Sequence, residues 1–125
     1  MEKEVIVTEK APKAIGPYSA GIAAGEMIFT AGQIPVNPET GEMPETIEEQ
    51  TRQSLSNVKA ILEAAGSCME KVIKTTVFMQ DLGEFAAMNG VYAEFFSEAY
   101  PARSAVQVAA LPKGAKVEIE AVALK

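Results

Sequence analysis

Apolar and polar residues alternate along the chain in two different rhythms. In six segments the apolar residues are β-branched or occupy every second position, which is typical of strands, whose side chains point to opposite faces in turn. In two longer segments they recur every three to four positions, which is typical of amphipathic helices. The predicted strands begin with Val5–Val7 and continue with Tyr18–Ala24, Met27–Ala31, Val72–Met79, Ser104–Ala109 and Val117–Leu124.

Each helical segment begins with a signal for a helix amino terminus. Thr46 and Glu49 form a capping box, in which both side chains bind the first free backbone amides, and Gly66 is placed to end that helix. Asp81 provides a similar start for the second helix, and Pro101 ends it. The residues expected on the buried helix faces are Ile47, Leu55, Val58 and Leu62 in the first helix and Phe85, Met88, Tyr92 and Phe95 in the second.

The connections between these elements are short and rich in turn residues. Gly25 and Glu26 form a two-residue hairpin turn with glycine in the first central position. The segment Gln33–Pro44 contains Pro, Asn and Gly residues that predict a surface loop. Because no segment resembles an interdomain linker, residues 1–125 are expected to form a single domain.

The order β-β-β-α-β-α-β-β predicts the α+β class, with two helices on one face of a mixed sheet. Two helices cover only one face of such a sheet. Since 48% of the residues are hydrophobic, the other face is expected to meet a second subunit rather than water. The sequence therefore favours self-association.

Composition and charge exclude several classes of function. The chain has no His, which rules out histidine general bases, Ser-His-Asp triads and His-containing zinc sites, and its one Cys forms no intrachain disulfide. A net charge of −6 disfavours nucleic acid as a partner. No apolar run approaches the roughly 18 residues of a membrane helix, and the acidic N-terminal segment does not resemble a secretory signal. A cytoplasmic protein with no membrane partner is therefore expected.

Two short motifs carry the strongest candidates for chemistry. Arg103, in the segment Pro101–Ser104, lies where the second helix gives way to a strand. Its guanidinium suits bidentate binding of a carboxylate, and a surface ion pair is the alternative. Glu118 and Glu120 share one face of the last strand. Such a pair can act as general acid and base, or it can be the solvated face of a half-exposed strand.

Three further residues have weaker signals. Tyr18 follows a Gly-Pro break and either points its phenol into a cleft or packs sideways with its hydroxyl in water. Asn89, beside the apolar stripe of the second helix, is either a hydrogen-bonding group of a cleft or a solvated residue. Cys68 has no basic neighbour closer in sequence than Lys71 and is expected to be a bystander thiol.

Several segments together resemble the Rid family, the YjgF-like reactive intermediate deaminases, from nearly one end of the chain to the other. The most specific is Pro101–Ser104 with Val106, Leu111 and Val117–Ile119, which fits the carboxy-terminal signature of that family in identity and spacing. The other matching segments are Ala14–Ser19, Ala31–Pro35, Arg52–Leu55 followed by Asn57 and Val58, and Lys74–Val77.

The resemblance implies a chorismate-mutase-like fold, assembled as a homotrimer with clefts between subunits. It implies hydrolysis of 2-enamine and 2-imine acids, such as 2-aminoacrylate and 2-aminocrotonate, to 2-keto acids and ammonia, with no cofactor and no metal. In this reaction Arg103 is implied to hold the substrate carboxylate, and Glu118 to position or activate water. The residues implied to line the cleft are Tyr18, Gly32, Asn89 and Ala105, the glycine and the alanine through backbone groups.

Three positions depart from common family members. Ala31, Ala105 and Gln107 stand where many relatives have serine, cysteine and glutamate, and these changes bear on substrate range and rate more than on reaction type. A non-catalytic trimer that binds a 2-keto acid or an amino acid in the same cleft, and regulates a partner, is the alternative function. A ribonuclease ranks last because of the net charge and the absence of His.

Overall fold

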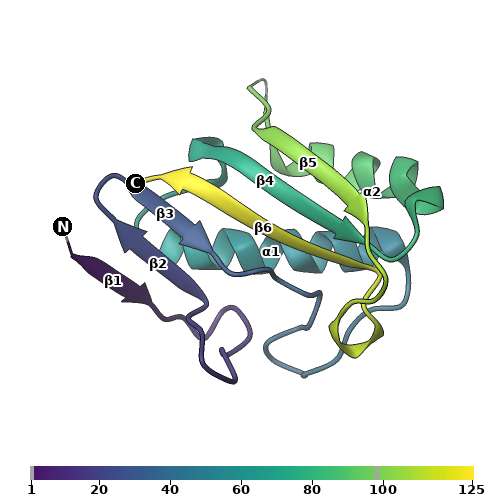
Figure 1. The fold of residues 1–125 in the computed structure, drawn as a ribbon, viewed down its shortest axis with the longest axis horizontal. Helices are drawn as coiled ribbons and strands as arrows, with labels where there is room; N and C mark the ends of the chain where they lie inside the picture. The colour runs from purple at the N-terminus through teal and green to yellow at the C-terminus, as the bar shows by residue number, and fades with distance from the viewer. Residues whose placement is uncertain (1, 98) are drawn as a thin grey trace.

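The computed structural model describes residues 2–97 and 99–125, which form a six-stranded mixed sheet backed by helices (Figure 1). The spatial order of the strands is β1-β2-β3-β6-β4-β5. The pair β4 and β5 is parallel, and the other neighbouring pairs are antiparallel. The strands are β1 (Lys3–Ile6), β2 (Gly21–Ala24), β3 (Met27–Thr30), β4 (Val72–Met79), β5 (Ala102–Gln107) and β6 (Val117–Leu124).

The helices α1 (Ile47–Ala64) and α2 (Phe85–Tyr92) lie on the same face of the sheet, as predicted (Figure 1). Thr46 Oγ1 accepts a hydrogen bond from the Glu49 amide at 3.1 Å, which confirms the predicted cap of α1. After α1, Gly66 has φ +83°, a left-handed conformation that glycine adopts without a steric penalty. The first helix therefore begins and ends where its sequence signals lie.

The second helix is shorter than predicted. Single 3₁₀ turns, Leu82–Glu84 and Ala93–Phe95, flank α2 on both sides. Phe95 therefore lies outside the α-helix and is half-buried, and Phe96 takes the buried place beside Tyr92 instead. The 3.6-residue period misplaced Phe95 because the tighter 3₁₀ turn rotates the last residues relative to an α-helix.

The bounds of β2 and β5 differ most from the prediction. β2 starts at Gly21 rather than Tyr18, because the chain turns at Gly16, whose carbonyl accepts a hydrogen bond from the Tyr18 amide at 2.9 Å. β5 spans Ala102–Gln107 instead of Ser104–Ala109, because its parallel pairing with β4 begins immediately after Pro101. β1 and β3 differ from the predicted bounds by one or two residues, and the predicted bounds of β4 and β6 are confirmed.

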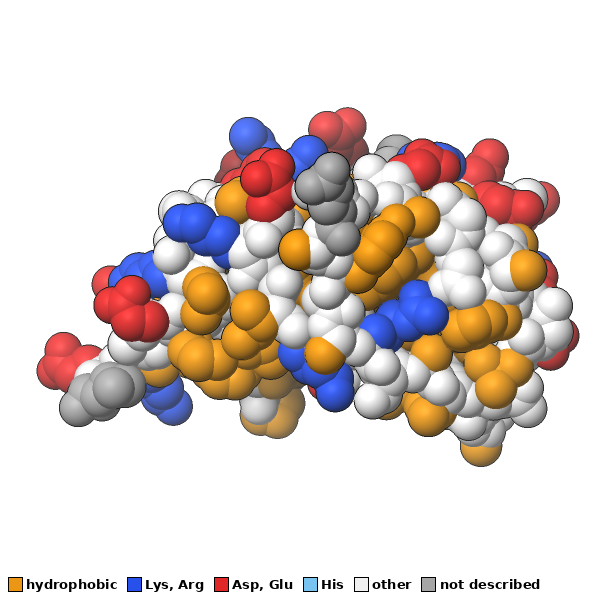
Figure 2. Space-filling view, turned by 90° about the horizontal axis from the view of Figure 1, so that it is seen from above, with side chains coloured by type: hydrophobic (Ala, Val, Ile, Leu, Met, Phe, Trp, Pro, Cys, Tyr) orange, Lys and Arg blue, Asp and Glu red, His pale blue; other side chains and the backbone are white. Residues whose placement is uncertain are grey.

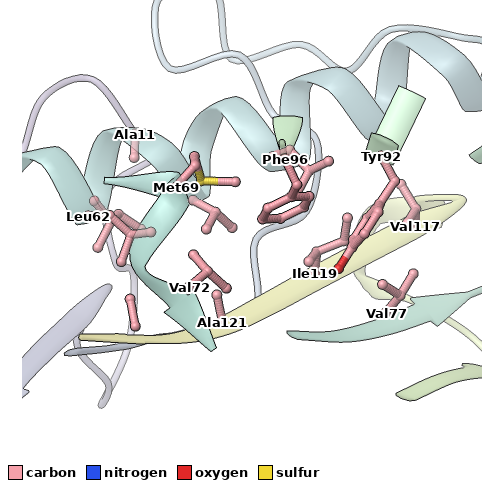
Figure 3. Close-up of a cluster of buried hydrophobic side chains, with 14 of the residues drawn as sticks. Ala11, Leu62, Met69, Val72, Val77, Tyr92, Phe96, Val117, Ile119 and Ala121 are labelled. Carbon is pink, nitrogen blue, oxygen red and sulfur yellow. The ribbon is translucent and has the colours of Figure 1, made fainter. Parts of the chain in front are cut away.

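The hydrophobic core lies between the sheet and the helices (Figure 3). Leu62 of α1, Val77 of β4 and Ile119 of β6 are fully buried there. Buried polar side chains of α1 also hold the loop that follows β3. Ser54 Oγ donates to the Gln33 carbonyl at 2.6 Å, and Asn57 donates to carbonyl groups of the same loop. These hydrogen bonds therefore also hold Gly32, the residue before Gln33, in a fixed position relative to the sheet.

The face of the sheet opposite the helices is open in the single chain. Phe29, Val106 and Leu124 of this face are 44%, 43% and 43% exposed. Figure 2 is turned by 90° from the view onto the strands, and on the side that it shows, apolar side chains also gather in patches, interrupted by Lys and Arg side chains. Apolar patches of this kind are typical of surfaces that another subunit covers.

Candidate functional site

Arg103 lies on the edge strand β5, with its side chain on the helix-covered face of the sheet. Its cross-strand partner is Thr75, which is 1% exposed and hydrogen-bonded to Tyr92 of α2, and directly opposed residues share a face. The guanidinium donates from Nη1 to Asn89 Oδ1 at 2.7 Å. Its central carbon lies 4.7 Å from the ring centre of Tyr92 and 5.2 Å from that of Phe85. Both β5 and α2 therefore hold the arginine in place.

The charge of Arg103 has no carboxylate partner among residues 2–97 and 99–125. A cavity of about 420 Å³ opens beside the guanidinium. Its lining residues are Asn89, Tyr92, Ala93, Tyr100, Pro101 and Arg103. Within the described residues, the arginine therefore faces a cavity rather than a salt bridge, and a ligand carboxylate can reach it.

Glu118 lies on the opposite face of the sheet. Its neighbours in β6, Val117 and Ile119, are fully buried on the helix side, so the alternation of a strand directs Glu118 away from the helices. Burial raises the pKa of Glu118, and the negative charge of Glu120 on the same face raises it further. A carboxyl group with a raised pKa is suited to proton exchange closer to neutral pH.

Gly32 brings the loop after β3 against this carboxylate. A Cβ atom at position 32 would lie 2.7 Å from Glu118 Oε2 and 2.9 Å from its carboxyl carbon, closer than such atoms approach. Glycine at this position therefore lets the carboxylate keep its place. Gly32 and Tyr18 line one cavity of about 550 Å³, and Tyr18 is 54% exposed. Glu118, Gly32 and Tyr18 thus form one group.

The candidate site residues fall into two half-sites that a single chain does not bring together. The arginine half-site consists of Asn89, Arg103 and Ala105, the last of which shares a face of β5 with Arg103. The carboxylate half-site consists of Tyr18, Gly32 and Glu118. Because the sheet lies between Arg103 and Glu118, one small ligand cannot contact both side chains of the same chain.

Sequence reasoning missed the surroundings of Arg103. It assigned Phe85 and Tyr92 only to the buried stripe of the second helix, and it did not select Thr75. The spacing of Phe85, Asn89 and Tyr92, four and then three residues apart, places all three on one helix face. This spacing could have identified the surroundings of Arg103 from the sequence. An arginine that packs against this helix face contacts two aromatic rings and one amide group.

The described residues give less support to thiol chemistry, a metal site or a membrane-spanning helix. Cys68 is a half-buried free thiol that lines neither the cavity beside Arg103 nor the one beside Gly32. Among residues 2–97 and 99–125, no three His, Cys, Asp or Glu side chains are arranged to hold a metal ion. In the same part of the chain, no helix has the length and apolar character needed to cross a membrane.

Comparison with known proteins gives full-length matches. The family model described as endoribonuclease L-PSP matches residues 8–125. The chain is 59% identical to a RutC family protein of Pyrococcus horikoshii and 56% identical to the 2-iminobutanoate/2-iminopropanoate deaminase of Escherichia coli, in each case over 98% of both chains. The structure of E. coli TdcF with bound serine has a TM-score of 0.95 and 53% identity over 98% of both chains. RidA from Psychrobacter sp. PAMC 21119 has a TM-score of 0.94 and 46% identity, covering 98% of this chain and 99% of that one.

Proposed function

The chain belongs to the Rid family, which includes the YjgF and RutC proteins, and on this basis we propose that it is an enamine/imine deaminase. It hydrolyses 2-enamine and 2-imine acids, including 2-aminoacrylate, 2-aminocrotonate and their imines, to 2-keto acids and ammonia. The observation that carries the proposal is the full-length similarity to the E. coli 2-iminobutanoate/2-iminopropanoate deaminase.

The active unit in this proposal is a homotrimer with a cleft between each pair of neighbouring subunits. The position of Arg103 and Glu118 on opposite faces of the sheet supports it, because a second copy is needed to bring the two half-sites together. The open apolar face of the sheet provides a surface for that copy. Three chains of 13.3 kDa, 39.9 kDa in all, close a symmetric ring with identical clefts.

In the cleft, Arg103 holds the substrate carboxylate. Its guanidinium offers two parallel N–H groups to a carboxylate, which fixes both the position and the plane of the substrate. Asn89 accepts one further N–H and so restricts rotation of the group. Tyr18 lines the opposite wall, and the backbone groups of Gly32 and Ala105 contribute hydrogen bonds to the bound molecule.

Hydrolysis of the imine needs one water and a group that moves protons. The substrate reacts as the protonated imine. Glu118 takes a proton from water as the water oxygen bonds to the imine carbon, and the C=N π electrons pass to nitrogen, which becomes a neutral amine. Glu118 then gives this proton to the amine, which turns it into an ammonium leaving group. The hydroxyl oxygen forms the C=O bond while the C–N bond breaks and the hydroxyl proton passes to Glu118 and from there to solvent, which releases the 2-keto acid and ammonia.

The electronic properties of Glu118 suit both steps. Its raised pKa makes the carboxylate a stronger base and keeps the protonated form accessible when the nitrogen needs a proton. The imine carbon is already electrophilic, so orientation by Arg103 and one acid–base group are sufficient, and no histidine is required.

The deaminase proposal is tested by competition with a chemical trap. Threonine dehydratase releases 2-aminocrotonate in situ, and semicarbazide captures what remains unhydrolysed. The protein is expected to divert flux from the semicarbazone to 2-ketobutyrate, and Arg103→Ala is expected to divert none. If the native protein leaves the semicarbazone yield unchanged, it is not a deaminase of this substrate.

The second candidate is a non-catalytic binding protein for a 2-keto acid or an amino acid. The similar structure of TdcF with bound serine favours this candidate, because it is a complex with an amino acid. Both functions use the carboxylate contact of Arg103. They separate in the trapping experiment, where a binding protein retains affinity for 2-ketobutyrate but leaves the decay of 2-aminocrotonate unchanged.

The description of the matching family model also names an endoribonuclease. The net charge of −6 and the absence of His argue against this activity in the present chain, because RNA is a polyanion. Incubation with labelled single-stranded RNA is expected to leave the RNA intact at protein concentrations that deaminate 2-aminocrotonate.

A further inference from the structure

The guanidinium of Arg103 is held by more than its hydrogen bond to Asn89. Its central carbon lies over the ring of Tyr92 at 4.7 Å and over that of Phe85 at 5.2 Å. Contacts of this length between a guanidinium and a ring face are attractive, and stacking restricts the tilt of the planar group. Of the two rings, Tyr92 is the nearer and the more deeply buried, at 4% exposed.

Tyr92 is itself fixed by the strand next to Arg103. Its hydroxyl and Thr75 Oγ1 share a hydrogen bond with an oxygen–oxygen distance of 2.7 Å. Thr75 of β4 pairs directly with Arg103 of β5, so strand pairing, the hydroxyl bond and the stacked ring form a closed loop of contacts. Phe96 packs against Tyr92, with ring centroids 4.8 Å apart.

Tyr92 remains a neutral phenol in this position. Burial raises its pKa, although the hydrogen bond with Thr75 and the charge of Arg103 oppose that effect. A neutral ring attracts the guanidinium without cancelling its charge, whereas a carboxylate in the same place would compete with a ligand carboxylate. The arrangement therefore orients Arg103 and leaves its full charge for the substrate.

We propose that Tyr92, braced by Thr75, is a positioning residue that sets the plane of the Arg103 guanidinium for carboxylate binding. This inference rests on the proposed function and adds to it a residue that acts through Arg103. The aromatic ring provides the stacking surface, and the hydroxyl bond to Thr75 keeps the ring from turning. Loss of the ring should therefore weaken recognition of the carboxylate more than it weakens any other property of the site.

The test compares two substitutions in the same part of the core. Tyr92→Leu removes the ring under Arg103, and Phe96→Leu removes a neighbouring ring that is also buried but is not one of the two rings over which the guanidinium lies. Circular dichroism, thermal unfolding and oligomer mass show whether both variants keep the fold. Two quantities are measured: kcat/KM for 2-aminocrotonate, and the ratio of the dissociation constants for 2-ketobutyrate and its carboxamide, 2-ketobutyramide.

Tyr92→Leu is expected to lower kcat/KM and to weaken binding of 2-ketobutyrate, each about tenfold, while binding of the amide changes little. Phe96→Leu is expected to leave the ratio of acid to amide binding unchanged. In the Arg103→Ala background, Tyr92→Leu is expected to cause no further loss of carboxylate affinity. The double variant Tyr92→Phe with Thr75→Val keeps the ring but removes the bond that keeps it from turning, so it is expected to weaken 2-ketobutyrate binding about threefold, less than Tyr92→Leu.

The proposal is overturned if Tyr92→Leu and Phe96→Leu change the acid-to-amide ratio equally, since Tyr92 then acts only in packing. It is also overturned if Tyr92→Leu weakens carboxylate binding equally with and without Arg103. These outcomes are distinct from failure of the proposed function. A native protein that binds 2-ketobutyrate but does not hydrolyse 2-aminocrotonate refutes the deaminase, while the binding ratio still decides the role of Tyr92.

Discussion

Two inactive variants should restore activity to each other if every site is shared between two chains. Arg103→Ala removes the carboxylate contact and keeps Glu118, whereas Glu118→Gln removes the proton-transfer group and keeps Arg103. Because the two side chains lie on opposite faces of one sheet, each variant disables a different half of every cleft. A homotrimer of either variant is expected to be inactive.

The expected recovery follows from the symmetry of a closed ring. In any trimer that contains both variants, one of the three clefts joins an intact Arg103 to an intact Glu118. Random assembly of equal amounts puts about three quarters of the trimers in the mixed state, so about one quarter of all clefts are intact. At other ratios the intact share falls symmetrically on both sides of this maximum.

The assay mixes the two unfolded variants at several ratios, refolds them together and follows deamination of 2-aminocrotonate. Each variant refolded alone is the control for refolding itself. A second control pairs Glu118→Gln with Gly32→Ala, which affect the same half-site and should not complement. Absence of recovery at every ratio, in samples that contain mixed trimers by mass spectrometry, would refute the shared cleft.

Further outcomes follow from the geometry of each half-site. Glu118→Gln should lower kcat at least about 100-fold, the scale of general acid–base catalysis, while the affinity for 2-ketobutyrate changes little. Glu120→Gln should lower kcat far less. Since the charge of Glu120 helps to raise the pKa of Glu118, Glu120→Gln should shift the acidic limb of the pH profile of kcat/KM to lower pH; an unchanged limb contradicts that coupling. Arg103→Lys keeps the charge but loses the planar pair of donors, so it should lose about 2 to 3 kcal/mol of transition-state stabilisation in kcat/KM, and full activity would show that charge alone suffices. Gly32→Ala should lower kcat/KM about 10- to 100-fold with little change in thermal stability, because the new methyl group displaces the movable carboxylate of Glu118; native kinetics would show that this contact is unimportant.

The fold was predictable where the pattern of the sequence is long and regular. β6 alternates over eight residues and β4 is rich in β-branched residues over the same length, and their predicted bounds match the structure. The cap at Thr46 was predictable because its signal is local. The 3₁₀ turns around α2 and the start of β5 were not, because short helices and edge strands are decided by contacts with distant parts of the chain.

The division of the candidate site between the two faces of the sheet could not be predicted from the sequence pattern either. Alternation shows that Glu118 and Glu120 share a face, but not which face, and it does not relate that face to Arg103. Only the register of β4 with both β5 and β6 establishes that Arg103 points toward α2 and Glu118 away from it. The support of Arg103 by Tyr92 and Thr75 likewise depends on residues far apart in the chain that the topology brings together.

The most direct measurement is the number of turnovers by the native protein. 2-Aminocrotonate is generated in situ by threonine dehydratase in large excess over the protein, and 2-ketobutyrate is recorded against time. A cleft that joins Arg103 to Glu118 predicts that the rate of 2-ketobutyrate formation rises in proportion to protein concentration, with many product molecules for each cleft. A rate equal to spontaneous hydrolysis at every protein concentration, in a sample that still binds 2-ketobutyrate, would contradict a catalytic cleft and leave a binding protein.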